Sequence, residues 1–194
     1  MSDKGRADAR RNRERLLEAA TAAFAAADGR AVSLESIARD AGVGIGTLYR
    51  HFPSREALVE AVYRSELAEV AAAAAKMLER HPPKEALRRW MDRYASFVAA
   101  KRGMAESLRA MFDSGAPGAP VPSQTHASIV AAVETLLRAG VDHGSLRPDV
   151  RADDVVSSLL GIFLASGSSE QAARMLDLLV AGVTKPGRAD AKVP

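Results

Sequence analysis

Polar side chains that can hydrogen-bond to phosphate lie close together in residues 44–51 of the chain. Thr47 and Tyr49 carry hydroxyl donors and Arg50 adds a positive charge, and such side chains are common partners of the phosphate oxygens of DNA. Two nearby glycines have no side chain, which would let a DNA backbone approach the main chain. We expect these residues to face outward and form one contact surface: Gly44, Ile45, Gly46, Thr47, Tyr49, Arg50 and His51.

The sequence gives no comparable indication of catalysis, a cofactor or a metal. It has no cysteine, which excludes thiolate chemistry, disulfides and Cys-ligated metals. The four histidines lack the spacing of a motif such as H-E-x-x-H. The glycine run at residues 42–46 has Tyr49 where a dinucleotide loop needs its third glycine. We therefore predict that the protein is not an enzyme and has neither cofactor nor metal site.

The charge of the chain is concentrated at its N-terminal end. The 194 residues include 27 Lys and Arg against 24 Asp and Glu, a net charge of only +3. Residues 1–55 hold 10 basic and 7 acidic side chains, whereas the remainder holds 17 of each. The longest uncharged apolar run, residues 155–169, is shorter than the ~20 residues of a membrane span. The charged start lacks the apolar stretch of a signal peptide, so we expect a cytoplasmic protein with no membrane segment.

Composition and periodicity predict an all-α fold. Alanine accounts for 39 residues and aromatic residues for only 5%, which favours helices over strands. In the first third of the chain, apolar residues at spacings of three and four predict helices at residues 9–27, 34–41 and 45–52. Ser33 is expected to cap the second helix and Ser54 a fourth. The inward set is predicted to be Leu16, Ala20, Phe24, Ile37, Ala38, Ala41, Leu48 and Phe52.

The rest of the chain is predicted to form longer helices. The fourth helix should end before Pro82 and Pro83, and further helices are expected at residues 84–101, 104–112, 123–139, 152–165 and 169–183. Residues 113–123 contain three prolines and two glycines and are expected to form a loop. We predict a DNA-binding domain at residues 1–55, a helical domain for ligand binding and dimerisation at residues 56–185, and a disordered tail at residues 186–194.

The short helices and their glycine-containing turn match a helix-turn-helix, and residues 31–58, AVSLESIARDAGVGIGTLYRHFPSREAL, resemble the DNA-binding signature of the TetR family of bacterial transcriptional repressors. The resemblance extends over about residues 11–63. It includes the Thr47-Leu48-Tyr49 triplet and the run that continues through His51 and Phe52. One departure is Arg55, because the family usually has Lys at this position. Beyond residue 63 the chain resembles the family in length and helical layout.

The resemblance implies a homodimer that lays the third helix of each subunit in a major groove of a palindromic operator in double-stranded DNA. Tyr49 and Arg55 would contact phosphates, and Thr47 and Ile45 would lie near bases or the DNA backbone. The basic run that includes Arg11 would add backbone or minor-groove contacts, and Ser33 completes the predicted DNA-binding set. The last two helices, about residues 152–183, would pair with those of the other subunit. A small-molecule effector bound among the middle helices would separate the two DNA-binding heads.

Two apolar groups in the second half of the chain fit this arrangement. We predict that a partly apolar effector pocket draws on some of the following residues, with at least half of them in the core instead: Trp90, Tyr94, Phe97, Met104, Leu108, Met111 and Phe112. Apolar residues that cover most of two helix surfaces indicate an interface between subunits: Leu159, Leu160, Ile162, Phe163, Leu164, Met175, Leu176, Leu178 and Leu179.

The sequence thus favours a ligand-responsive repressor of transcription, released from its operator by a small, largely apolar effector. One alternative is a helical small-molecule binding protein, or an enzyme, that keeps the helix-turn-helix as a scaffold. Another is an activator, or a regulator without any effector, because repression or activation depends on where the operator lies relative to the promoter.

Overall fold

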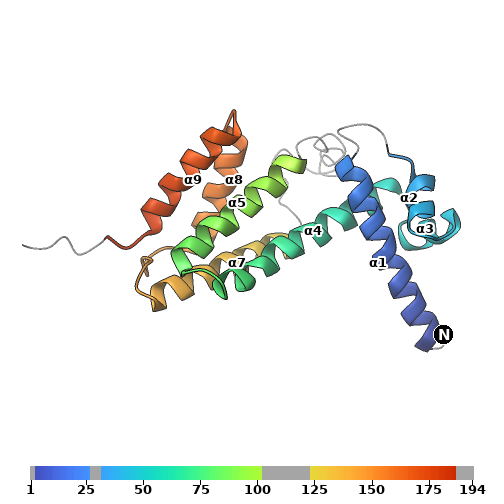
Figure 1. Ribbon diagram of the computed structural model, residues 1–194, viewed down its shortest axis with the longest axis horizontal. Coiled ribbons are helices and arrows are strands. Elements are labelled where there is room, and N and C mark those ends of the chain that lie inside the picture. Colours follow the sequence, from blue (N-terminus) through green and yellow to red (C-terminus); the bar gives the residue numbers. More distant parts are fainter. Residues whose placement is uncertain (1–2, 27–31, 102–122, 187–194) are drawn as a thin grey trace, which may run out of the picture. The chain divides into compact units, whose positions relative to one another are not determined.

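The computed structural model describes residues 3–26, 32–101 and 123–186 (Figure 1). These residues form eight α-helices and no strand, which confirms the all-α prediction. They divide into two compact units. We call the first the head unit, which comprises the described residues up to Glu66 together with Ala100 and Lys101, and the other the second unit, which comprises Leu67–Ala99 and the described residues from Ser123 onward. The predicted helix at residues 104–112, the loop after it and the C-terminal tail lie outside the described residues.

The head unit contains α1 (Asp3–Ala26), α2 (Leu34–Asp40), α3 (Ile45–His51) and the beginning of α4 (Arg55–Leu78). The predicted boundary between the domains lies after residue 55, at the start of α4. In the structure the two units divide further along this helix, after Glu66. Helix α1 begins six residues earlier than the predicted start at Ala9. Its first turns carry no large apolar side chain, so periodicity could not reveal them, although arginine and alanine favour a helix.

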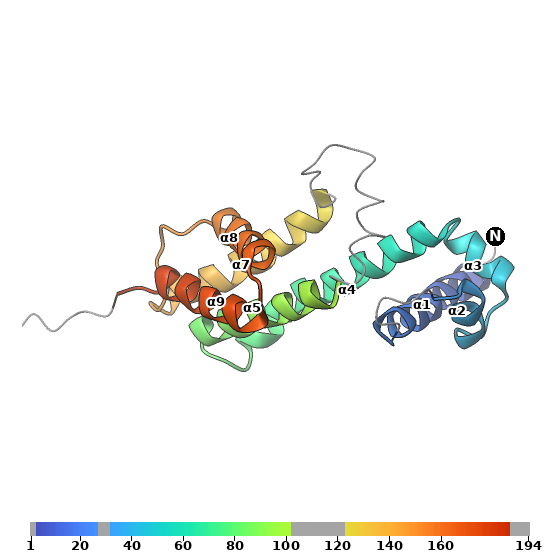
Figure 2. The ribbon, with the colours of Figure 1, turned by 90° about the horizontal axis from the view of Figure 1, so that it is seen from above.

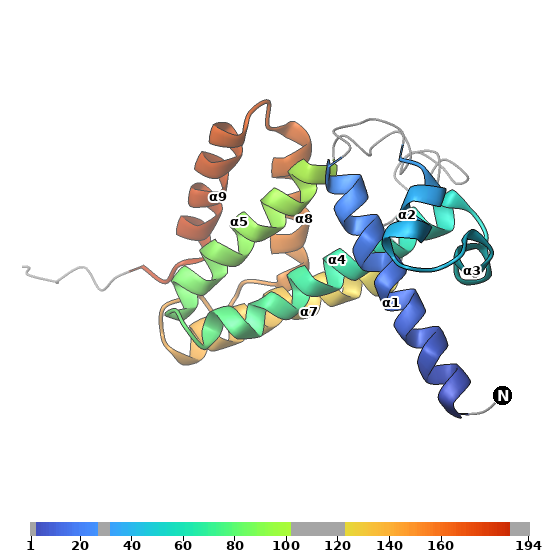
Figure 3. The same cartoon turned by 45° about the vertical axis from the view of Figure 1, so that its right-hand side comes forward.

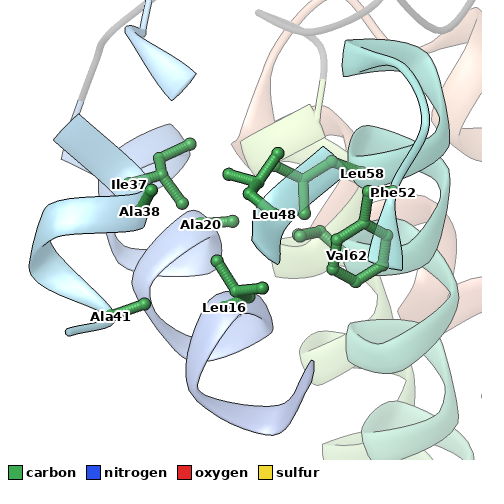
Figure 4. Close-up of a cluster of buried hydrophobic side chains, with 9 residues drawn as sticks. All are labelled: Leu16, Ala20, Ile37, Ala38, Ala41, Leu48, Phe52, Leu58 and Val62. Carbon is green, nitrogen blue, oxygen red and sulfur yellow. The ribbon is translucent and has the colours of Figure 1, made fainter. Parts of the chain in front are cut away.

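The core of the head unit is made by one face of each of these helices, as Figure 4 shows. Apolar residues of α1, α2, α3 and α4 meet in a single cluster, which we call the head core: Leu16, Ala20, Ile37, Ala38, Ala41, Leu48, Phe52, Leu58 and Val62. This confirms the predicted inward set, except that Phe24 is only partly buried against the cluster. Burying these side chains is what holds two helices of only seven residues each in place.

The second unit contains the remainder of α4, α5 (Pro83–Lys101) as far as Ala99, α7 (Ser123–Asp142), α8 (Ala152–Ala165) and α9 (Ser169–Val183). Helix α8 packs against both α7 and α9, and α8 and α9 form a hairpin, which is visible in Figures 2 and 3. The predicted end of α4 before the two prolines is confirmed, since this helix ends at Leu78.

The apolar residues of α8 and α9 divide between the core of this unit and its surface. Leu159, Ile162, Phe163 and Leu176 are buried within the unit. By contrast, Leu164 is 87% exposed and Leu178 is 73% exposed. The predicted group is therefore partly ordinary core, and what stays uncovered is a narrower apolar surface on the α8–α9 hairpin.

The connection between α7 and α8 is fastened to the end of α9. Leu146 forms an isolated antiparallel bridge with Thr184, and the Arg147 backbone N–H donates to the Val183 carbonyl at 3.0 Å. The Arg147 guanidinium also donates to the Gly182 carbonyl at 3.1 Å. A cation on the last carbonyls of a helix is favourable because these groups carry partial negative charge. These contacts hold the connection between α7 and α8 against the end of α9.

Gly140 lies where this connection turns back over α7, and a Cβ atom there would come within 2.3 Å of Leu146 Cδ1. Leu146 is 1% exposed and has little room to move. We therefore expect Gly140→Ala to lower the free energy of unfolding of the second unit by about 1–3 kcal/mol, measured by urea denaturation. Gly182→Ala is the matched control, because the added methyl there meets nothing within 4 Å. Equal stability of the two variants would contradict this account of Gly140.

Candidate nucleic-acid interface

Helix α2 begins at a side-chain cap. The Ser36 backbone N–H donates to Ser33 Oγ at 3.3 Å, which confirms Ser33 as the predicted N-cap. The Ser33 hydroxyl in turn donates to Glu35 Oε2 at 2.7 Å, and this hydrogen bond lowers the pKa of the exposed Glu35 carboxyl. A carboxylate in the first turn also complements the helix dipole. The entrance of α2 is thus fixed by local polar contacts.

The turn between α2 and α3 requires a glycine. Gly42 has φ of +67°, a conformation that costs other residues energy because of their Cβ atom. Its N–H donates to the Arg39 carbonyl at 2.9 Å, and the Val43 N–H donates to the Ala38 carbonyl at 2.9 Å. This pair of bonds is the Schellman motif, which satisfies the last carbonyls of a helix while reversing the chain. It sets the direction in which α3 leaves α2.

Helix α3 buries one side and exposes the other. Leu48 is its one buried residue and lies in the head core. Ile45 and Tyr49, four residues apart and therefore on one face, are 37% and 46% exposed. The next pair around the helix, Gly46 and Arg50, is exposed as well. We call the exposed residues Gly44, Ile45, Gly46, Tyr49 and Arg50 the α3 face.

The α3 face agrees with most of the predicted contact surface. Thr47 and His51 flank it and are half-buried rather than exposed. The His51 ring lies 6.3 Å from the ring of Phe52. Gly44 and Gly46 have open space where a Cβ would be, so the head itself does not need glycine there. The face offers one phenol, one guanidinium and bare main chain, groups suited to phosphate oxygens and groove edges.

The basic residues of α1 already have partners within the helix. Arg11 contacts the Asp8 carboxylate, and Arg10 lies 3.8 Å from Glu14. These pairs are exposed, and exposed ion pairs add at most about 1 kcal/mol, so the guanidinium groups can exchange a carboxylate for a phosphate. Arg13 differs, because its Cζ lies over the Phe52 ring, 5.2 Å from the centroid. That contact links α1 to the residue that ends α3.

Arg55, the first residue of α4, is half-buried and bonded inside the head unit. Its Nη1 donates to the Val32 carbonyl at 2.6 Å, and its Cζ lies 5.9 Å from the centroid of the Phe24 ring. Sequence reasoning missed these partners, because both are more than twenty positions away in the chain. The role in phosphate binding that the resemblance implied for Arg55 stays a prediction.

Three of the four aromatic residues predicted for an effector pocket form a packed row on α5. Trp90, Tyr94 and Phe97 are 0%, 5% and 9% exposed. Tyr94 lies 5.6 Å from Trp90 and meets Phe163 of α8 edge-on at 5.4 Å between ring centroids. The indole N–H of Trp90 donates to the Val70 carbonyl at 2.8 Å. These three residues belong to the core of the second unit, and the predicted Met104, Leu108, Met111 and Phe112 lie outside the described residues.

A groove of about 520 Å³ occurs elsewhere in the second unit, between the start of α5 and α9. Arg88 stands in its wall and donates to Asp177 Oδ1 at 2.7 Å, which joins the two helices. No local pattern in the sequence predicts this groove, because its two sides are some ninety residues apart.

Two further features of the described residues bear on function. They contain no group of three or more His, Asp or Glu side chains placed to hold a metal ion. None of the described helices is long and apolar enough to cross a bilayer.

Two family models match the sequence. Residues 16–62 match a model described as bacterial regulatory proteins of the tetR family. Residues 82–185, more than half of the chain, match the C-terminal domain of SbtR-like transcriptional regulators. The first match covers α2, α3 and the whole head core, and the second covers α5, α7, α8 and α9.

Solved structures resemble most of the chain. A TetR transcriptional regulator from Streptomyces coelicolor is 40% identical with a TM-score of 0.71, and the match covers 90% of this chain and 99% of that one. A TetR transcription regulatory protein from Mycobacterium vanbaalenii is 33% identical with a TM-score of 0.66, and covers 93% and 99% respectively. Among curated sequences, an HTH-type transcriptional regulator from Staphylococcus aureus is 39% identical over 62 residues, which is 32% of this chain and about a third (34%) of that protein's length.

Proposed function

Because this chain belongs to the TetR family of bacterial transcriptional regulators, we propose that it is a dimeric repressor that binds a palindromic operator through α3 and is released by a small, largely apolar effector. The observation that supports DNA binding best is the α3 face. It presents Tyr49, Arg50 and two glycines away from the head core, while Leu48 on the opposite side anchors the helix. Such a protein would work in the cytoplasm, where the DNA is.

Each residue of the interface has a proposed role. The Tyr49 hydroxyl and the Arg50 guanidinium donate to phosphates, with Thr47 and His51 at the edges of the same surface. Ile45, Gly44 and Gly46 lie against the groove, where the main chain and the shape of the DNA carry much of the selectivity. Arg11 and its neighbours on α1 add backbone or minor-groove contacts. Ser33 lies at the entrance of α2, where its hydroxyl would exchange the Glu35 carboxylate for a phosphate.

Dimerisation is proposed through the α8–α9 hairpin. Leu164 and Leu178 are large apolar side chains left 87% and 73% exposed on adjacent helices, and a second copy would cover both. A two-fold dimer presents two α3 faces, which matches the symmetry of a palindromic operator.

The effector is proposed to bind in the second unit, next to the aromatic row of α5. Met104, Leu108, Met111 and Phe112, which the sequence predicts as further lining, lie outside the described residues. Release from DNA needs only differential affinity: the effector must bind the non-operator form more tightly, because equal affinity for both forms shifts nothing.

Selection of bound sequences from a random DNA pool tests this proposal. We expect the full-length protein to enrich one palindrome. Tyr49→Ala should lower affinity for that palindrome by roughly tenfold or more, because it removes hydrogen bonds to a charged group. The slope of log affinity against log salt should stay unchanged, because the phenol is neutral.

Arg50→Ala should instead reduce the slope of log affinity against log salt by about 0.9 per subunit, because it removes one charge that neutralises a phosphate. Arg138→Ala removes the same charge from an exposed position on α7 in the second unit and is the matched control. If the wild type enriches no sequence, or binds weakly and equally with and without Tyr49, the repressor proposal fails. A helical small-molecule binding protein would then be the better description.

A further inference from the structure

From the contacts of Arg55 we infer that this residue, provided the proposed function holds, is a positioning residue that sets the placement of α2 and α3 for operator binding and is not a phosphate contact. The inference rests on where its guanidinium is engaged. Nη1 donates to the Val32 carbonyl at 2.6 Å, and the group lies over the Phe24 ring at 5.9 Å. The side chain is half-buried, unlike the exposed Arg50 on the α3 face.

The two partners of Arg55 belong to the elements that carry α3. Phe24 lies in the last turns of α1 and packs against the head core. Val32 also packs against that core and immediately precedes Ser33, the N-cap of α2. Because Arg55 is itself the first residue of α4, one guanidinium joins the end of α1, the entrance of α2 and the start of α4.

A displacement at the entrance of α2 would be passed on to the α3 face. Helix α2 continues through the Gly42 turn, whose two backbone hydrogen bonds fix the direction of α3. Both helices have seven residues, too few to be stable alone, so their placement depends on contacts with α1 and α4. Arg55 supplies such a contact at Phe24 and Val32, and Arg13 supplies another at Phe52, directly after α3.

The chemistry of these contacts calls for arginine rather than lysine. A guanidinium is planar, so it can donate hydrogen bonds from its edge while its flat surface stacks on an aromatic ring. Lysine offers a compact, strongly hydrated point charge with no flat surface. A lysine at this position would keep the charge for a phosphate but would lose the arrangement that holds Val32 and Phe24 together.

The test compares Arg55→Lys and Arg55→Gln in the full-length protein. Affinity is measured for the selected operator and for unrelated duplex DNA over a range of salt concentrations. Amide hydrogen exchange in α2 and α3 is measured without DNA. We expect both variants to lose roughly tenfold in operator affinity, the scale of a charge-assisted hydrogen bond, with the wild-type salt slope and with little change for unrelated DNA. Exchange in α2 should be faster in both.

A phosphate contact would give the opposite pattern. Arg55→Lys would then bind like the wild type, and Arg55→Gln would lose about 0.9 in salt slope per subunit, as Arg50→Ala is expected to do. Either result overturns the inference. Faster exchange with an unchanged ratio of operator to unrelated affinity would mean that Arg55 only stabilises the head, and this also overturns it. If the wild type selects no sequence, the proposed function is wrong, and the inference fails with it. If the wild type selects an operator but the Arg55 variants do not behave as expected, only the inference is wrong.

Discussion

A protein with both Leu164→Glu and Leu178→Glu is expected to be monomeric and to bind its operator about a thousandfold more weakly than the wild type. The two leucines are 87% and 73% exposed, so each charge is easily solvated in a single subunit. In a two-fold dimer, each substitution appears twice in the same interface. Four carboxylates would then be taken out of water without partners, at a cost of several kcal/mol for each one that is fully buried.

DNA affinity is lost because the two α3 faces are no longer joined in one molecule. When two binding modules are joined, the second binding event becomes intramolecular and typically adds about 10²–10⁴ in affinity. Sedimentation velocity gives the oligomeric state, and titration of the operator at fixed salt gives the affinity. Val141→Glu is the matched control, because it places the same charge on an exposed apolar residue of α7 in the same unit. A double variant that still sediments as a dimer would show that the α8–α9 hairpin is not the interface.

Leu48→Ala is expected to destabilise the head unit by about 2–5 kcal/mol, the range for removing a fully buried leucine. Leu48 is 0% exposed and is the residue through which α3 enters the head core. Without it, α3 keeps its few backbone hydrogen bonds but has no buried side chain of its own, and only Phe52 after its end remains in the head core. We expect amide protection in α3 to collapse and operator binding to disappear under conditions where the second unit is still folded.

Ile45→Ala provides the comparison within the same helix. Ile45 is 37% exposed and lies on the α3 face, so its truncation should change stability by less than about 0.5 kcal/mol. Urea denaturation monitored by amide hydrogen exchange gives the free energy of unfolding of the head unit in each variant. Similar destabilisation by both would mean that the burial pattern of α3 is not what holds this helix.

Local signals in the sequence predicted the elements of the fold well. Ser33 before an apolar helical repeat predicted the start of α2, and the pair Pro82 and Pro83 predicted that α4 ends before them. Both signals act over a few residues, because a cap or a missing N–H affects only the adjacent turn. The α3 face could be predicted for the same reason, since the position of Leu48 determines which side of a short helix is buried.

Contacts between distant parts of the chain could not be predicted in this way. Arg55 looked like a charged residue at a helix start, and nothing near it in the sequence pointed to Val32 or Phe24. The bridge between Leu146 and Thr184 likewise joins segments almost forty residues apart. Periodicity also could not separate core from pocket lining, so Trp90 and its neighbours were compatible with either until their packing against α8 was known.

The empty space beside Gly46 bears on how regulators of this kind can diverge. A Cβ atom added there meets nothing within 4 Å beyond its chain neighbours and its own helix backbone, and replacing a helical glycine by alanine generally strengthens a helix. If α3 lies against DNA as proposed, an alanine at this position would change the contact with DNA and leave the packing of the head unit as it is. Gene duplication followed by change at Gly46 offers a route to a paralogue with a different set of target genes, while the head core and the α8–α9 hairpin remain as they are.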